Sequence, residues 1–419
     1  MKEKNSVSLK IQIKNETNKC VKCGLCTTVC PTYQLTKEEG ENPRGRIALM
    51  EGLALEKLSA TPKLVSYLNH CLNCRACEII CPAEVSYSTL IQASKSLLYQ
   101  EKKQSKPLFI LNILKKNKRI RWLSYLLFIY QRLGIQALVR KSGLLKASAL
   151  YHYDAIIPTL SKPKQFENFY YPQNIPQGNI ALFINCINPL FETKTIHAVI
   201  ELLTKIGYGV YIPSAQTCCG ALALEQGDEN TAYQFLKENE QAFSEYKVEN
   251  IISFTSACAL TLKEYQYLVN EPHLQTFAKK VIHIDHFLSI INWPENIFFT
   301  PLQKKVLIHQ SCTLKNGLKE IGLMHRFLSL IPELTIINMP IQQFCCGASG
   351  KYFLEYPDTA SKLLQPIIDY AEKEKPDYFL TSNIGCQLHI ARALKSIPIS
   401  HPIELLVQQL QLKTSHQSP

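Results

Sequence analysis

Half of the 16 cysteines in this chain lie in two copies of one pattern, Cys-x2-Cys-x2-Cys-x3-Cys-Pro. The first copy contains Cys20, Cys23, Cys26, Cys30 and Pro31, and the second contains Cys71, Cys74, Cys77, Cys81 and Pro82. Two-residue spacers let three thiolates converge from one tight loop, whereas the fourth cysteine, just before proline, points away from that loop. The pattern predicts ligation of [4Fe–4S] clusters, whose chemistry is the transfer of single electrons.

The motif is the one found in two-cluster bacterial ferredoxins, where the fourth cysteine of each run ligates the other cluster. We therefore expect Cys20, Cys23, Cys26 and Cys81 to hold one cluster, and Cys71, Cys74, Cys77 and Cys30 to hold the other. Zinc is the alternative, but it gives no reason for the third cysteine and the closing proline in both copies. A disulfide framework is disfavoured because the chain is long, the cysteines are clustered and no secretory signal precedes them.

The other eight cysteines indicate an internal duplication. They are Cys186, Cys218, Cys219 and Cys258 in a first half, and Cys312, Cys345, Cys346 and Cys386 in a second half. Equivalent positions are separated by 126, 127 and 128 residues (312−186, 345−218 and 386−258). Each vicinal pair is followed by glycine, which permits a strained turn and close approach of backbone N–H groups to sulfur. Four thiols per half suggest a further metal or redox site; buried structural cysteines, or one degenerate half, are the alternatives.

Short apolar runs in each half predict buried strands that alternate with helices. The predicted strands are 179–184, 210–213 and 251–254 in the first half, and 305–308, 336–340 and 378–381 in the second; helical stretches include 197–206 and 359–374. This alternation predicts right-handed crossovers and two similar α/β halves. The cysteines fall at or just after the ends of these strands, which is the edge where open α/β sheets bind ligands.

The segment between the two ferredoxin-type runs predicts helices. Pro43-Arg44-Gly45 is typical of a turn, and the apolar run 47–55 predicts a helix, so we expect an α-helical ferredoxin domain. Arg44 and Arg46 are expected either to donate hydrogen bonds near the clusters or to be solvated. The predicted architecture is a multidomain α+β protein: a ferredoxin domain at 1–100, a helical segment and linker at 101–178, and two α/β halves at 179–300 and 301–412.

Residues 107–145 predict one or two amphipathic helices. The longest uncharged stretch, Trp122–Gln131, spans 10 residues, whereas a transmembrane helix needs about 20. Basic residues interleaved with aromatic ones allow contact with a membrane surface, and packing against the protein itself or a partner is the alternative. Residues 151–178, rich in Pro, Tyr and Asn, predict a linker.

Composition limits the class of protein. The 419 residues suffice for two or three domains, and many cysteines without a signal peptide favour a reducing, cytoplasmic compartment. The formal net charge of +12 is reduced when clusters bind, and the remaining basic excess favours an anionic membrane surface or an acidic partner. Nucleic acid is a weaker expectation, because no aromatic–basic platform accompanies the charge.

Together these features resemble one family. The eight ferredoxin-type cysteines, Asn42–Arg46, two Cys-Cys-Gly domains in this order, and the stretches 218–222, 256–258 and 383–386 resemble the iron–sulfur subunit of glycolate oxidase. The chain more loosely resembles heterodisulfide reductase B/C subunits and the C subunit of anaerobic glycerol-3-phosphate dehydrogenase. The resemblance implies that an FAD-containing partner oxidises glycolate or D-lactate. It also implies that this chain passes the electrons to a quinone-type acceptor, in the cytoplasm or at the cytoplasmic face of the inner membrane.

The chain departs from the heterodisulfide reductase pattern, whose Cys-Cys-Gly domains close with Cys-x2-Cys. The last position of that pair is Thr261 in the first half and His389 in the second. His389 could supply an imidazole ligand in place of the thiolate, or simply occupy a helix face. This loss disfavours a disulfide-reducing enzyme; a cluster-bearing scaffold or thiol-based redox sensor is a further hypothesis. No catalytic residue is expected on this chain, and His283 and His286 are expected at the end of a strand and the start of a helix.

Overall fold

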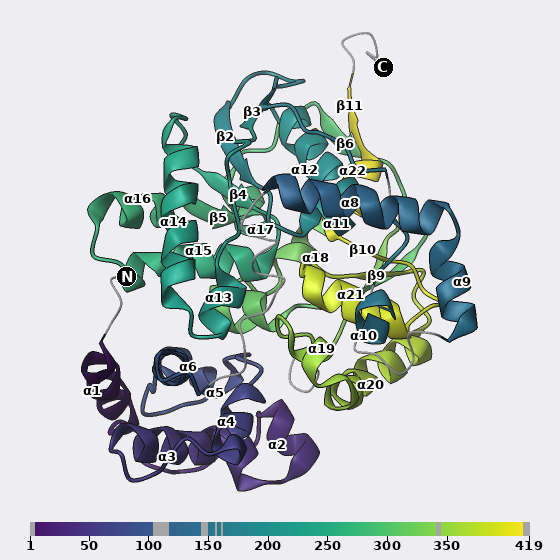
Figure 1. Ribbon diagram of the computed structural model, residues 1–419. Helices are drawn as coiled ribbons and strands as arrows, with labels where there is room; N and C mark the ends of the chain where they lie inside the picture. The colour runs from purple at the N-terminus through teal and green to yellow at the C-terminus, as the bar shows by residue number, and fades with distance from the viewer. Residues whose placement is uncertain are drawn as a thin grey trace.

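The computed structural model describes residues 5–103, 117–143, 150–155, 157–160, 162–340 and 345–413. Within residues 5–103 the chain forms helices joined by loops (Figure 1). These are α1 (Ser6–Thr17), η1 (Leu25–Thr27), α2 (Pro31–Thr36), η2 (Glu39–Glu41), α3 (Pro43–Ala54), α4 (Pro62–Asn69), α5 (Ala76–Ile79) and α6 (Tyr87–Gln100). Helices α1, α3 and α6 pack around a core that includes Leu9, Ile13, Met50, Leu90 and Leu97. The predicted α-helical ferredoxin domain is confirmed in its fold.

The turn predicted at Pro43-Arg44-Gly45 is wrong, because these residues form the first turn of α3. Asn42 is the N-cap, and its side chain accepts a hydrogen bond from the Gly45 N–H at 2.7 Å. Proline suits the first helical position, where its missing N–H costs no hydrogen bond. Gly45 is required there, because an added Cβ would lie 1.9 Å from the carbonyl oxygen of Glu39.

The segment that follows is helical where the structure describes it. It contains α8 (Asn117–Arg132), α9 (Ile135–Ser142) and α10 (Leu150–Ala155), before the short strand β1 (Phe169–Tyr170). Helix α8 lies across α11 (Asn188–Phe191) of the first α/β half (Figure 1). Predicted positions 107–116 and 144–145 lie outside the described residues, and the rest of the predicted helical segment is confirmed. Among the described helices, none combines the length and apolar character needed to cross a bilayer.

The first α/β half is built on a sheet of order β1-β3-β2-β4-β5, in which β2, β3, β4 and β5 are parallel and β1 is antiparallel to β3. Its strands are β2 (Gly178–Phe183), β3 (Tyr208–Tyr211), β4 (Ile251–Ser253) and β5 (Val281–His283). Its helices are α11 (Asn188–Phe191), α12 (Thr193–Lys205), α13 (Ala221–Glu225), α14 (Glu229–Ser244), α15 (Ser256–Leu268), α16 (Pro272–Lys280) and α17 (Ile284–Ile290). The predicted strands are thus confirmed to within two residues.

The second half repeats the parallel part of this sheet, with order β10-β9-β7-β8. Its strands are β7 (Lys305–Ile308), β8 (Thr335–Asn338), β9 (Tyr378–Leu380) and β10 (Ile399–Ser400). Its helices are η3, a π-helix (Thr313–Leu318), α18 (Leu323–Leu328), α19 (Tyr352–Glu355), α20 (Pro357–Glu374), α21 (Ile384–Ala393) and α22 (Pro402–Gln409). Because β3-β2-β4-β5 corresponds to β8-β7-β9-β10, the topology confirms the predicted duplication.

The two halves share one hydrophobic core. Ile180, Leu182 and Val199 of the first half belong to the same buried cluster as Val306 and Ile403 of the second. Helix α22 packs on α12, and β11 (Leu410–Leu412) pairs antiparallel with β6 (Ile297–Phe299). Since the last elements of the chain close on the first half, the two halves form one packed unit that holds the cysteines at fixed positions.

Candidate metal centres

The first ferredoxin-type run lines a cavity near the surface. Cys20, Cys23, Cys26, Cys77 and Cys81 line this outer cavity, together with residues that include Pro43, Arg44 and Tyr87. Cys81, the last cysteine of the second run, therefore lies with the three leading cysteines of the first. Cys23 is solvent-exposed, so this cavity opens towards the outside of the protein.

The second run lines an inner cavity next to the outer one. Cys30, Cys71, Cys74 and Cys77 line it, along with Arg46 and Tyr87. Cys30 of the first run thus lies with the leading cysteines of the second. Cys77, Pro43 and Tyr87 line both cavities, which places the two groups of thiols against a common wall. This arrangement brings together the two sets of cysteines that the sequence predicts.

The two cysteine loops have the same backbone shape. Lys22 and Gly24 have φ of 58° and 83° in the first loop, and Asn73 and Arg75 have φ of 46° and 58° at equivalent places in the second. Left-handed residues alternating with right-handed ones turn successive N–H groups towards one concavity, which suits anionic sulfur. The Asn73 N–H lies 3.5 Å from the Cys71 sulfur and donates to it.

The donor sets fit the predicted clusters. Each cavity is lined by at least four cysteine sulfurs, the donor type that holds [4Fe–4S] clusters. Burial raises the pKa of the Cys77 thiol well above its ordinary value, and burial and the nearby Cys312 and Cys345 do the same for Cys74. Thiolates packed this closely need a cationic core to compensate their charge, and bound iron would supply it.

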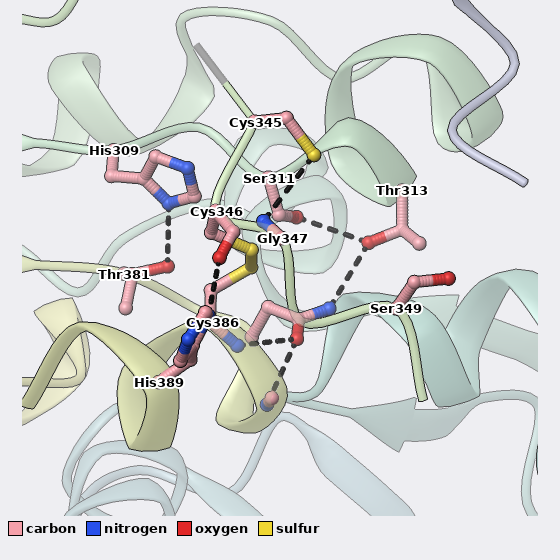
Figure 2. The surroundings of a disulfide bond; sticks show 12 residues. His309, Ser311, Thr313, Cys345, Cys346, Gly347, Ser349, Thr381, Cys386 and His389 are labelled. Atoms are coloured by element: carbon pink, nitrogen blue, oxygen red, sulfur yellow. Dashed lines mark hydrogen bonds between the residues drawn. A yellow bond between two sulfur atoms is a disulfide. The ribbon is translucent and has the colours of Figure 1, made fainter. Parts of the chain in front are cut away.

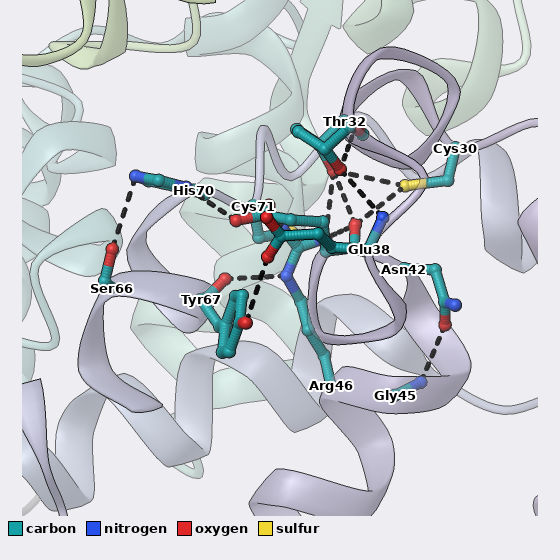
Figure 3. Close-up of polar contacts among 12 residues, drawn as sticks. Cys30, Thr32, Glu38, Asn42, Gly45, Arg46, Ser66, Tyr67, His70 and Cys71 are labelled. Carbon is teal, nitrogen blue, oxygen red and sulfur yellow. Dashed lines mark hydrogen bonds and ion pairs between the residues drawn. The ribbon is translucent and has the colours of Figure 1, made fainter. Parts of the chain in front are cut away.

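Arg46, which lines the inner cavity, forms a buried ion pair with Glu41, and Figure 3 shows the polar contacts around it. The Arg46 guanidinium, 1% exposed, donates to the Glu41 carboxylate at 2.6 Å and to the Glu41 and Tyr67 carbonyl oxygens at 2.6 and 2.7 Å. It also reaches the Thr32 hydroxyl at 3.2 Å, which in turn contacts the Cys30 sulfur at 3.4 Å. Arg46 is therefore not solvated, and it holds the loop that carries Cys30 in place.

Arg44 behaves differently from Arg46. It forms a two-pronged ion pair with Glu39, at 2.8 and 3.0 Å, with both side chains more than a third exposed. This pair lies at the rim of the outer cavity, which Arg44 lines. The carboxylate of Glu39 has its pKa lowered chiefly by this hydrogen bond from Arg44.

In the first α/β half the four cysteines lie together. The Cys186 thiol donates to the Cys218 sulfur at 3.5 Å, and hydrogen bonds from Cys186 and then Cys219 hold the pKa of Cys218 well below its ordinary value. Cys219 in turn shares a hydrogen bond with Cys258. The Gly220 N–H donates to the Cys218 sulfur at 3.4 Å, which confirms the predicted role of this glycine. The set offers four sulfur ligands, as a cluster or a zinc ion requires.

In the second half, Cys345 lies apart from Cys346 and Cys386 (Figure 2). Cys346 and Cys386 are buried and form a disulfide, which the sequence did not lead us to expect. The Cys345 sulfur points away from them and accepts a hydrogen bond from the Gly347 N–H at 3.4 Å. Cys345 packs against the same hydrophobic cluster as Cys74 of the inner cavity, and the charges of Cys312 and Cys345 contribute to the raised pKa of Cys74.

A histidine that sequence analysis missed lies beside the disulfide. A ring nitrogen of His309 and the sulfurs of Cys346 and Cys386 all lie within 4.8 Å of one another, the one such group found among the described residues. His389, which the sequence singled out, instead donates from Nδ1 to the Cys346 carbonyl at 2.6 Å. The signal that could have found His309 is its place directly after a predicted strand and three residues before Cys312.

The ferredoxin domain is anchored to both α/β halves through the second cysteine loop. Asn316 of η3 donates to the Cys74 carbonyl at 2.7 Å, and Ser349 donates to the Leu72 carbonyl at 2.8 Å. Arg75 forms a two-pronged ion pair with Glu264 of the first half. The loop that lines the inner cavity is thus fixed directly to the segments that carry Cys312 and Cys345.

Two clusters of buried polar side chains each combine residues from both α/β halves. His283, Asp285 and Glu320 form one cluster, and Glu192 and Glu404 form another. His283 ends β5 and caps α17, as predicted for a strand end and helix start. His286 lies next to Glu320 and is half-exposed.

Thr261 occupies the position in the first half where the heterodisulfide reductase pattern has its closing cysteine. Its hydroxyl donates to the Ala257 carbonyl within its own helix, at 2.9 Å.

Comparisons with known proteins agree with these features. Residues 16–85 match the 4Fe-4S dicluster domain, residues 180–263 and 306–391 each match the cysteine-rich domain, and residues 104–153 match the linker region of the glycolate oxidase iron-sulfur subunit. The order of these matches is the order in which the structure builds the ferredoxin domain, the helical segment and the two α/β halves. The first of these matches supports iron–sulfur ligation by the ferredoxin-type runs.

Several known proteins resemble the chain. It is 28% identical to the probable glycolate oxidase iron-sulfur subunit of Bacillus subtilis and 29% identical to the glycolate oxidase iron-sulfur subunit of Escherichia coli, over 94% of both partners in each comparison. It is also 27% identical to lactate utilization protein A of Geobacillus thermodenitrificans, over 54% of this chain and 98% of that protein.

Proposed function

Because this chain belongs to the family of glycolate oxidase iron–sulfur subunits, we propose that it is the electron-transfer subunit of a glycolate oxidase. An FAD-containing partner oxidises the 2-hydroxy acid, and this chain carries the electrons to a quinone-type acceptor on the cytoplasmic side of the membrane. The observation that carries the proposal is the pair of adjoining cysteine-lined cavities inside the domain set of that family.

The residues of the ferredoxin domain divide into two ligand sets. Cys20, Cys23, Cys26 and Cys81 hold one [4Fe–4S] cluster, and Cys71, Cys74, Cys77 and Cys30 hold the other. Such clusters supply one-electron transfer at potentials set by burial and by hydrogen bonds to sulfur. The protein contributes the left-handed loop residues, the buried Arg46–Glu41 pair, and Tyr87 on the shared wall.

The cysteine groups follow one another through the molecule. Cys23 is exposed at the outer cavity, Cys77 joins the outer and inner cavities, and Cys74 of the inner cavity faces Cys312 and Cys345. This order supports a path that begins or ends at the exposed Cys23 and continues into the second α/β half. The cysteines of the two halves then serve as further iron–sulfur sites, in the second half once the Cys346–Cys386 disulfide is reduced.

Lactate is the second candidate substrate. The relatives named lactate utilization protein A match 54% of this chain, which favours a related 2-hydroxy acid as the donor. In both proposals this chain only transfers electrons. Glycolate and lactate therefore differ as substrates of the flavoprotein partner and not as ligands of this chain.

Helices α8 and α9 support a peripheral contact with an anionic membrane. Residues 117–143 contain six basic residues and no acidic one. Trp122, Leu126, Ile129 and Leu133 recur at helical spacing and are 48–70% exposed, while Ile120 and Ser124 face the protein. An amphipathic helix with aromatic and aliphatic residues on one side and cations beside them lies at the interface of anionic lipid. This surface would hold the chain close to a quinone dissolved in the bilayer.

Co-purification tests the function. The chain is produced anaerobically together with its flavoprotein partner, and reduction of an artificial dye is followed with glycolate, D-lactate and glycerol 3-phosphate as donors. We expect glycolate- or lactate-dependent reduction that disappears when Cys71→Ser is introduced and the flavoprotein is left unchanged. Zinc in place of iron, fewer than eight irons per chain, or reduction of disulfides by this chain alone would each refute the proposal.

A further inference from the structure

His309 occupies a position suited to a metal ligand. It is the first residue after β7, at the sheet edge where the cysteines gather, and it is 4% exposed. One of its ring nitrogens shares a space less than 4.8 Å across with the sulfurs of Cys346 and Cys386. Imidazole nitrogen and thiolate sulfur are both donors that iron accepts.

The second nitrogen of the His309 ring already has a partner. Nδ1 lies 3.1 Å from the hydroxyl oxygen of Thr381, at the end of the neighbouring strand β9 (Figure 2). An Nδ1–H that donates to this hydroxyl leaves the lone pair on Nε2. Ligating histidines almost always donate their other N–H to an oxygen in this way, because the bond fixes both the tautomer and the ring plane.

The first half has no equivalent of this histidine. His309 precedes Cys312 by three residues, and Phe183 precedes Cys186 by three residues. Phe183 is buried in the hydrophobic core of the first half. The duplicated halves therefore keep their cysteines at matching positions but differ in one donor: the first half offers sulfur alone, and the second offers sulfur and one imidazole.

His389 has a different role. Its Nδ1–H donates to the carbonyl oxygen of Cys346, and its ring packs against Phe353. It therefore positions the backbone of Cys346 rather than facing the sulfurs. The histidine that can take the place of a missing thiolate is His309, which comes from a different strand.

We propose that His309 ligates iron through Nε2, together with the thiolates of Cys346 and Cys386, in an iron–sulfur cluster of the second α/β half. This inference rests on the proposed function, in which the halves hold clusters. Cys345 lies apart from this group, with its sulfur directed away from Cys346 and Cys386, so the protein ligands that the structure brings together for this centre are His309, Cys346 and Cys386. The second half thereby holds a centre with mixed nitrogen and sulfur ligation, and the first half holds one with sulfur alone.

Ligation requires that the Cys346–Cys386 disulfide be open. An added dithiol opens it by thiol–disulfide exchange: the dithiol becomes a cyclic disulfide, and Cys346 and Cys386 are released as two thiols. Both thiols then lose their protons to solvent as they bind iron. Assembly on the full chain therefore needs a dithiol reductant in addition to iron and sulfide.

A centre held by one neutral imidazole and two thiolates carries less negative charge than one held by four thiolates, and this raises its reduction potential, as histidine ligands do in Rieske centres. The two halves should then be reduced at different potentials, with the second half reduced first. In the variant His309→Cys the added thiolate should lower the potential of the second-half centre alone.

Pulsed electron paramagnetic resonance detects the ligand directly. The full chain is reconstituted anaerobically with iron, sulfide and dithiothreitol, reduced stepwise, and examined for hyperfine coupling to nitrogen in samples with natural or 15N-labelled histidine. We expect one reduced centre to show a histidine coupling that changes with the isotope. The coupling should vanish in His309→Phe, which copies the first half, and persist in His389→Gln, which keeps a donor for the Cys346 carbonyl.

The outcomes separate this inference from the proposed function. A nitrogen coupling that persists in His309→Phe, a reconstituted wild-type chain without any histidine coupling, or zinc alone bound at this site would overturn the assignment. Each of these can occur while glycolate-dependent dye reduction through the ferredoxin domain is intact, so the function would stand. If His309→Phe does not fold, His309→Cys provides the same test, because it keeps a ligand and removes the nitrogen.

Discussion

At the scale of single residues, two arginines separated by one position have opposite environments. Arg44 and Glu39 pair in contact with solvent, whereas Arg46 and Glu41 pair where both side chains are at most 5% exposed. Removing one partner of a buried pair leaves an uncompensated charge, which costs about 3–5 kcal/mol, while an exposed pair contributes about 0–1 kcal/mol. Arg46 also donates to two backbone carbonyls that shape the loop carrying Cys30.

We therefore expect Arg46→Met to destabilise the ferredoxin domain by about 3–5 kcal/mol and to speed the loss of its clusters. Arg44→Met is the matched control and should change the stability by less than about 1 kcal/mol. Anaerobic urea unfolding, followed by the visible absorbance of the clusters, measures both variants. Equal effects of the two substitutions would show that the buried pair has no special part in holding the inner cavity.

At the scale of elements, helices α12 and α22 bring two carboxyl groups together. Glu192 caps α12, and Glu404 lies in the first turn of α22. Burial, and secondarily the neighbouring Glu404, raise the pKa of Glu192 from 4.5 to about 8. Asn188 donates to the Glu192 carboxyl, and Thr195 donates to Glu404. The packing of the two α/β halves therefore favours a protonated Glu192 at neutral pH.

This raised pKa makes the stability of the packed halves depend on pH. Below pH 4.5 the folded and unfolded chains both hold the proton; between pH 4.5 and about 8 only the folded chain does. The contribution of Glu192 is therefore complete in acid and is lost as pH rises towards 8, at about 1.4 kcal/mol per pH unit. Glu192→Gln should flatten this decline when urea unfolding is measured from pH 5 to pH 8. An unchanged slope would contradict the assignment.

At the scale of the whole molecule, the sequence alone predicted the features that follow from the spacing of residues along the chain. Cysteine offsets gave the duplication, and apolar runs gave the strands, because both follow from local periodicity. The prediction of a turn at Pro43 was wrong, because the side chain of Asn42 caps a helix that begins there. His309 was missed because its importance comes from β9 and α21, which bring Thr381 and Cys386 beside it. Contacts across strands carry no signature in a single sequence.

The surface of α8 and α9 yields a prediction for the assembled molecule. With six cations, no acidic residue and an exposed apolar row over residues 117–143, the chain should bind vesicles of phosphatidylcholine mixed with phosphatidylglycerol and should be released by salt. Vesicles of phosphatidylcholine alone should bind weakly. A side chain the size of leucine contributes about 1.5–3 kcal/mol when it leaves water, so Leu126→Ser with Leu133→Ser should weaken binding at least tenfold.

The control for this experiment is a double variant that loses exposed apolar side chains outside α8 and α9. Tyr171 and Ile175, 78% and 79% exposed, lie in the segment before β2, and Tyr171→Ser with Ile175→Ser should leave vesicle binding unchanged. The measurement is co-sedimentation of the full chain, with and without the flavoprotein. If neutral and anionic vesicles bind equally, or if both double variants bind as well as the wild type, α8 does not contact lipid. If the flavoprotein abolishes vesicle binding and protects Trp122 from quenchers, the apolar row is instead the surface that docks the partner.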